Sequence, residues 1–157
     1  MHGFVSVVVP FVALIALLLW AGLEDIRRRE IANWKTGAIV LLAPVWWWAN
    51  GLYPWPDVAA QIGLAIGVFA IFAAAFHFGW MGGGDVKLIA ALALWLPFGG
   101  FVAMLVAMSL AGGAITLALI AEQRLRRRSG NIEIPYGVAI AFAAIVTIRE
   151  PILNQLS

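Results

Sequence analysis

The chain has 157 residues, of which 64% are hydrophobic and 11% are charged. A soluble domain is typically about 45–50% apolar and about 25% charged, and a chain this short cannot bury so large an apolar share. The composition therefore excludes an ordinary water-soluble domain. It favours one membrane-embedded domain, residues 1–157, whose partner is the lipid bilayer. The absence of cysteine excludes disulfides and thiolate metal sites, and nucleic-acid binding is not expected because the basic residues lie beside apolar segments.

Six apolar segments follow one another, at 4–23, 37–53, 57–79, 86–98, 100–121 and 136–149. A transmembrane helix needs about 20 apolar residues, and backbone groups in lipid must form their hydrogen bonds within the segment. We therefore predict an all-α, polytopic membrane protein, a bundle of about six transmembrane helices. The fourth segment is short, so it would need residues of the preceding glycine loop or local thinning of the bilayer.

Two sequence features predict where these helices meet the membrane interface and where they contact one another. The consecutive tryptophans Trp46–Trp48 suit the belt of aromatic residues at a membrane interface. Small residues four positions apart, Gly63 with Gly67 and Ser109 with Gly113, favour the close approach of neighbouring helices.

Lysine and arginine predict the orientation. With six spans, nine basic residues lie on one side of the membrane, and the loops on the other side contain only Arg149. The positive-inside rule makes the first side cytoplasmic, so both termini are expected to face outward. The nine residues are Arg27, Arg28, Arg29, Lys35, Lys87, Arg124, Arg126, Arg127 and Arg128.

Two aspartates stand at helix ends, where a charge beside hydrocarbon marks a functional candidate. Asp25 ends the first span, directly after Glu24, and Asp85 begins the fourth span after the glycines at 82–84. The predicted topology puts both aspartates at the cytoplasmic end, so they could meet inside one bundle. Asp85 could instead only cap its helix, and Asp25 could be a solvated acid paired with an arginine. Position alone does not choose between Glu24 and Asp25.

A shared site would give these two carboxylates a chemistry. Two adjacent carboxylates cannot both ionise easily, so the pair holds one proton and supplies a general base and a general acid. No serine has a plausible nearby histidine, so aspartyl chemistry without metal or cofactor is the hydrolytic chemistry that the residues support. The three glycines before Asp85 lack β-carbons, so their backbone can take positive φ and approach a neighbour closely.

The run Gly82-Gly83-Gly84-Asp85 resembles the Gly-x-Gly-Asp motif of the type IV prepilin peptidases, a family of intramembrane aspartyl proteases. The stretch at 25–34, DIRRREIANW, is similar to the segment that carries the family's first catalytic aspartate, and 134–139, IPYGVA, resembles its Pro-Tyr-Gly helix start. The resemblance covers most of the chain. It implies that Asp25 and Asp85 are the catalytic pair and that Gly82 and Gly84 shape the motif.

The resemblance also implies a function. It is that of an aspartic-type endopeptidase of the bacterial inner membrane, which cuts the basic leader from prepilin-like precursors at the cytoplasmic face. The short chain is similar to the versions that serve Flp/Tad pilus assembly and secretion. Larger members carry a cysteine-containing insert and also N-methylate the new terminus, so methylation is not expected here. Many relatives have Ile-Pro-Asn where this chain has Ile31-Ala32-Asn33, so we expect a less rigid loop after Asp25.

Two other functions compete with this one. A small transporter or channel would bind protons or cations through its acids, but it would need acids within the spans and often inverted repeats, which the sequence does not show. A non-catalytic scaffold of a pilus or secretion complex would need neither aspartate. Ion flux in liposomes that is unaffected by changing both aspartates would favour the transporter. Assembly that continues after both aspartates are changed would favour the scaffold.

Overall fold

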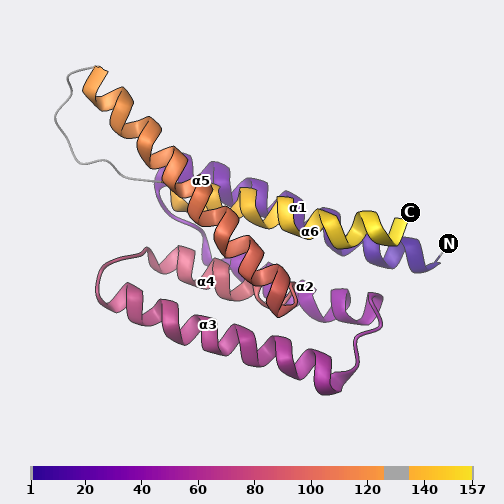
Figure 1. The fold of residues 1–157 in the computed structure, drawn as a ribbon. Helices are drawn as coiled ribbons and strands as arrows, with labels where there is room; N and C mark the ends of the chain where they lie inside the picture. The colour runs from indigo at the N-terminus through magenta and orange to yellow at the C-terminus, as the bar shows by residue number, and fades with distance from the viewer. Residues whose placement is uncertain (1, 126–134, 157) are drawn as a thin grey trace.

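The computed structural model describes residues 2–125 and 135–156, and within these ranges the chain folds into six α-helices with no strand (Figure 1). A short irregular turn, η1 (Pro54–Val58), leads into the third helix. The helices are α1 (His2–Arg28), α2 (Asn33–Ala49), α3 (Ala59–His77), α4 (Gly83–Leu92), α5 (Phe98–Leu125) and α6 (Tyr136–Leu156). The all-α prediction is confirmed.

Among the described residues, three segments are long and apolar enough to cross a membrane: Val5–Arg28, Pro54–His77 and Phe98–Leu125. α4 is different, because its ten residues extend only about 15 Å, about half of a ~30 Å hydrocarbon core. The predicted segment 86–98 therefore does not form one helix, although the helix does include residues of the preceding glycine loop, as expected. The helix starts within the glycine run, ends at Leu92, and turns follow as far as Trp95.

The helices pack around α4 and α6. α6 packs against both α1 and α5, while α4 contacts α2, α3 and α6. The start of α1 and the end of α6 lie at the same end of the bundle (Figure 1). The loop from α1 to α2 and the start of α4 lie at the opposite end, so this end gathers segments that are distant in the sequence.

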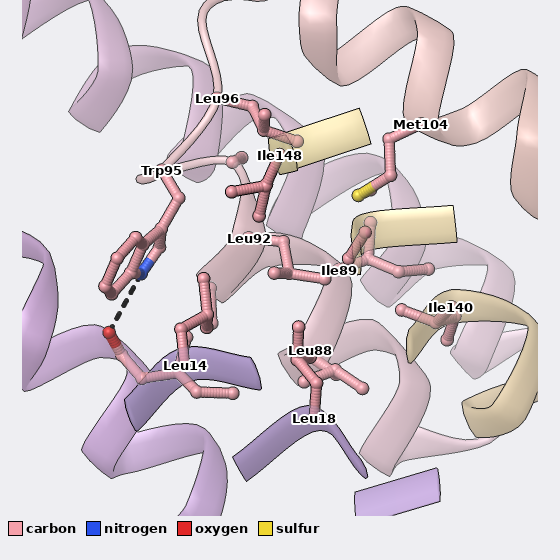
Figure 2. Packing of buried hydrophobic residues seen from close by; sticks show 14 of the residues in the cluster. Leu14, Leu18, Leu88, Ile89, Leu92, Trp95, Leu96, Met104, Ile140 and Ile148 are labelled. Atoms are coloured by element: carbon pink, nitrogen blue, oxygen red, sulfur yellow. Dashed lines mark hydrogen bonds between the residues drawn. The ribbon is translucent and has the colours of Figure 1, made fainter. Parts of the chain in front are cut away.

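α4 is the centre of the core because it is apolar nearly all round, which favours burial of a helix on every side. Its residues Leu88, Ile89 and Leu92 have no exposed surface and belong to one cluster with Leu14 of α1 and Ile140 of α6 (Figure 2). This packing fixes α4, and with it the first turn of α4, relative to α1 and α6.

The three consecutive tryptophans of α2 have different environments. Trp46 is buried and stacks on Trp95, with ring centroids 5.4 Å apart, whereas Trp48 is 76% exposed. Trp47 donates its indole N–H to the carbonyl of Leu94 at 2.7 Å. Consecutive residues are turned by about 100° on a helix, so the three cannot share one face. The interface prediction fits Trp48 and is wrong for Trp46, which is a core residue.

The outer surface of the bundle is apolar, as a lipid-facing surface should be. Leu41 and Leu110 are among the large apolar side chains that are mostly exposed. A β-carbon at Gly63, Gly67 or Gly113 would have no neighbouring atom within 4 Å. The predicted close helix contacts at these glycines therefore do not occur within the part of the chain that the structure describes.

Candidate active site

The two neighbouring acids at the end of α1 have different partners. The Glu24 carboxylate accepts hydrogen bonds from the Lys35 ammonium at 2.6 Å and from the Ala32 N–H at 3.2 Å. Asp25 is turned away from it by about 100° and is buried. The structure thus distinguishes two acids that position alone left equivalent, because Glu24 joins α1 to α2 whereas Asp25 faces α6.

Lys35, a charge of the first loop in the sequence prediction, is a buried residue of α2 with 1% of its surface exposed. Its ammonium lies 4.6 Å from the centroid of the Trp20 ring and 5.7 Å from that of Trp34. A buried ammonium needs an opposite charge or another electron-rich partner, and Glu24 and the two indole faces supply both. The pair holds the end of α1 against the start of α2.

The loop after Asp25 contains Ala32, at the position where the family resemblance leads us to expect proline. The N–H of Ala32 donates to Glu24, which a proline could not do because it has no N–H. Ile31 is buried, with 8% of its surface exposed. The lower rigidity expected for this loop stays a prediction, but the hydrogen bond of Ala32 and the buried side chain of Ile31 both tie the loop to the bundle.

Asp25 is positioned by the start of α6. Its Oδ2 accepts a hydrogen bond from the backbone N–H of Gly137 at 2.8 Å. The first N–H groups of a helix have no partner within the helix, so a carboxylate is favoured there. A β-carbon at Gly137 would lie 2.9 Å from Oδ2 and 3.0 Å from Cγ of Asp25. The glycine of the Pro-Tyr-Gly sequence is thus needed for the aspartate to approach the helix end.

Asp85 lies in the first turn of α4, after the N-cap residue Gly82. A β-carbon at Gly82 would lie 3.1 Å from Oδ2 of Asp85, and one at Gly84 would lie 3.2 Å from the β-carbon of Ile31. None of the three glycines has a positive φ. The freedom to take positive φ is therefore not used here. The expected close approach is found, because Gly82 leaves room for the Asp85 carboxylate and Gly84 lets the loop after Asp25 approach the start of α4.

The two aspartates line one cavity of about 320 Å³. Its walls come from the end of α1 and the loop that follows it, and from the glycine run with the first turn of α4. Arg29, Glu30 and Asn33 also line it. The close contact between Gly84 and Ile31 joins the two segments, so the structure brings together acids 60 positions apart in the sequence.

The cavity changes the pKa of Asp85, which lies outside the three segments that are long enough to cross a membrane. Burial, and then the neighbouring charge of Asp25, raise the pKa of Asp85 to about 6, although a hydrogen bond with the Gly82 backbone opposes this shift. Asp85 therefore binds a proton more readily than an exposed aspartate. The cavity can hold one carboxyl and one carboxylate side by side.

Two features of the site were missed in the sequence. Gly137 was used in the sequence analysis only as part of a motif. Its position directly after Pro135 and Tyr136, at the start of an apolar segment, indicates that its N–H lies at a helix start and has no partner within the helix. Lys35 was counted only as a charge. In the part of the chain that the structure describes, no three His, Asp or Glu side chains form a group that could hold a metal ion.

An all-helical bundle with three candidate spans and two aspartates on one cavity defines a membrane protein with a candidate dicarboxylate site. The sequence model of the type IV leader peptidase family matches residues 12–117, a stretch that contains both aspartates, and the chain belongs to this family. It is therefore a membrane peptidase at the level of the family. Neither the curated proteins nor the solved structures include a significant match.

Proposed function

We propose that the protein is an intramembrane aspartyl endopeptidase that removes the basic leader of prepilin-like precursors at the cytoplasmic face of the bacterial inner membrane. The observation that supports this most is the single cavity lined by Asp25 and Asp85 in a chain of the type IV leader peptidase family. Gly82 then serves the site by leaving room for the Asp85 carboxylate, and Gly84 serves it by letting the start of α4 approach Ile31.

In the proposed reaction the aspartate pair holds one proton. The ionised carboxylate takes a proton from water while the water oxygen bonds to the carbonyl carbon, and the carboxyl gives its proton to the carbonyl oxygen. The tetrahedral diol then gives one proton to the aspartate that has become ionised, the C–N bond breaks, and the leaving nitrogen receives the proton that the other aspartate took from water. The pair again holds one proton. Asp85, with its raised pKa, is the better candidate for the initial carboxyl. Asp25, which accepts the N–H of Gly137, is the better candidate for the base.

The proposed orientation puts this cavity on the cytoplasmic side, in a protein with about six spans and both termini outside. Arg27, Arg28 and Arg29 end α1 or follow it directly, at the cavity end of the bundle, and Lys87 lies in the first turns of α4. Arg126, Arg127 and Arg128 lie outside the described residues. A precursor would have its apolar helix in the bilayer and its leader in the cytoplasm, and the acids of the cavity would attract basic leader residues. The processed protein would serve pilus assembly of the Tad type.

The test is cleavage of a purified precursor, with a basic leader and an apolar helix, by the protein in detergent micelles. Asp25→Asn and Asp85→Asn keep the side-chain shape but remove an acid or base, so each should slow cleavage by about 10²–10⁴-fold. Asp57→Asn is the matched control, because Asp57 lies in η1, before α3, and does not line the cavity. Cleavage at the unaltered rate by Asp85→Asn would overturn the proposed aspartyl mechanism, whereas no cleavage by the unaltered protein would favour a scaffold.

A further inference from the structure

A second, larger cavity of about 770 Å³ lies between α2 and α3, which both pack against α4. Val40 and Leu41 of α2 and Ile66 and Phe69 of α3 line its walls, and Ala90 of α4 lies on its floor. We call this cavity the α2–α3 groove. Its size is that of a ligand site.

The polar groups of the groove gather at one end. Asn33 and Thr36 come from the first turn of α2, and Lys87 from α4. The Lys87 ammonium donates a hydrogen bond to Oδ1 of Asn33 at 2.9 Å. Because the other lining residues are apolar, apart from backbone groups, an occupant must be apolar along most of its length.

The polar end of the groove adjoins the aspartates. Asn33 lines both the groove and the cavity of Asp25 and Asp85. Lys87 follows Asp85 by two residues in the same helix. A long apolar molecule lying along the groove therefore has one end at Asn33 and Lys87, next to the proposed catalytic pair. A polar segment attached to that end would enter the cavity of the two aspartates.

We propose that the α2–α3 groove binds the apolar helix that follows the cleavage site of a precursor. The proposal rests on the proposed function. In lipid, the backbone of such a segment must satisfy its own hydrogen bonds, so it enters as a helix. A helix in a groove uses apolar side chains at positions i, i+3, i+4 and i+7, which suit the apolar walls. The residues before that helix then extend past Asn33 into the cavity, where the peptide bond meets the aspartates.

Filling the groove tests this directly. Gly37 lines the groove, and a β-carbon there would have no neighbour within 4 Å, so Gly37→Trp can place an indole in the groove. Gly67→Trp is the matched control, since Gly67 is equally open but does not line the groove. We expect Gly37→Trp to raise KM for the precursor on the order of tenfold, with a smaller change in kcat, and Gly67→Trp to leave KM unchanged. An unaltered KM for Gly37→Trp would overturn the proposal.

Crosslinking gives a second measurement that does not depend on cleavage. A benzophenone amino acid replaces Leu41, which is 77% exposed and lines the groove, or Ile71, which is 71% exposed and does not. Both variants carry Asp85→Asn, so the precursor stays intact. We expect a precursor adduct at position 41 and none at 71. Equal adducts at both positions, or only a phospholipid adduct at 41 in the presence of precursor, would contradict the proposal.

The two proposals fail in different ways. If the proposed function is wrong, the unaltered protein does not cut the precursor. If only the groove proposal is wrong, the unaltered protein cuts the precursor, Gly37→Trp cuts it with the same KM, and position 41 gives no more precursor adduct than position 71.

Discussion

The Asp25 carboxylate and the backbone N–H of Gly137 form a hydrogen bond of 2.8 Å that joins α1 to the start of α6. The two residues are 112 positions apart, so the contact exists only in the folded bundle. It sets the direction of one of the two aspartates, because a carboxylate held by a helix-end N–H loses its freedom to rotate.

Gly137→Ala should misplace Asp25. The new β-carbon would lie 2.9 Å from Oδ2, so the carboxylate or the start of α6 must shift, and a shift of about 1 Å can slow catalysis by about 10²-fold. The measurement is the kcat for precursor cleavage, with thermal unfolding in detergent to confirm folding. Gly113→Ala, where the added carbon meets no atom within 4 Å, should keep the original kcat. A Gly137→Ala protein with the original kcat would show that this contact does not matter.

Two glycines of the same run should respond differently to alanine. At Gly84 the new carbon would lie 3.2 Å from the β-carbon of Ile31, which is fixed to the backbone. At Gly83 it would meet the ring of Phe76 at 3.3 Å, and Phe76 is 54% exposed and can turn aside. Gly84→Ala should therefore lower stability by about 1–3 kcal/mol, as overpacking does, and slow cleavage, while Gly83→Ala should be mild. Equal effects in unfolding and cleavage assays would argue against this account of the glycine run.

Removing the cation at Lys35 should destabilise the junction of α1 and α2. Lys35→Met leaves the half-buried Glu24 carboxylate without its ammonium partner, and breaking an ion pair with a buried member from one side is more harmful than replacing both members. We expect the thermal midpoint to fall clearly in Lys35→Met and to recover in part when Glu24→Gln is added. A double-mutant cycle of unfolding midpoints measures this. Strictly additive effects would mean that the 2.6 Å contact contributes no coupling.

Cleavage should fall as the pH rises through the range in which Asp85 loses its proton. Its pKa is raised to about 6, so below this pH the carboxyl is protonated and can act as the acid. Above it both aspartates become charged and the shared proton is lost. We expect kcat/KM to decrease by about tenfold per pH unit above the apparent pKa. Profiles measured from about pH 5 to about pH 8 should show this in the unaltered protein and in Asp57→Asn. A flat profile would contradict the assigned role of Asp85.

Hydropathy located the helices well because transfer of apolar side chains into lipid depends on local composition. The predicted first segment, 4–23, lies within α1, and the predicted start of the last at 136 coincides with α6. The length of α4 was not predictable in this way. Its end follows from contacts of the next residues with α2, such as the Trp95 indole N–H that donates to the carbonyl of Ile39 at 3.1 Å.

By itself the sequence determined the helical class, the apolar segments and the motif around Asp85, because these depend on residue type and short spacing. Only the tertiary structure decided that Asp25 and not Glu24 faces the cavity. Neighbouring positions on a helix differ by about 100°, so the placement of α2 and α6 around α1 decides which helix each acid contacts. It also decided that Lys35 is buried and that Gly137 is a hydrogen-bond donor to Asp25. These contacts join segments distant along the chain, and their geometry is set by how the helices pack around α4.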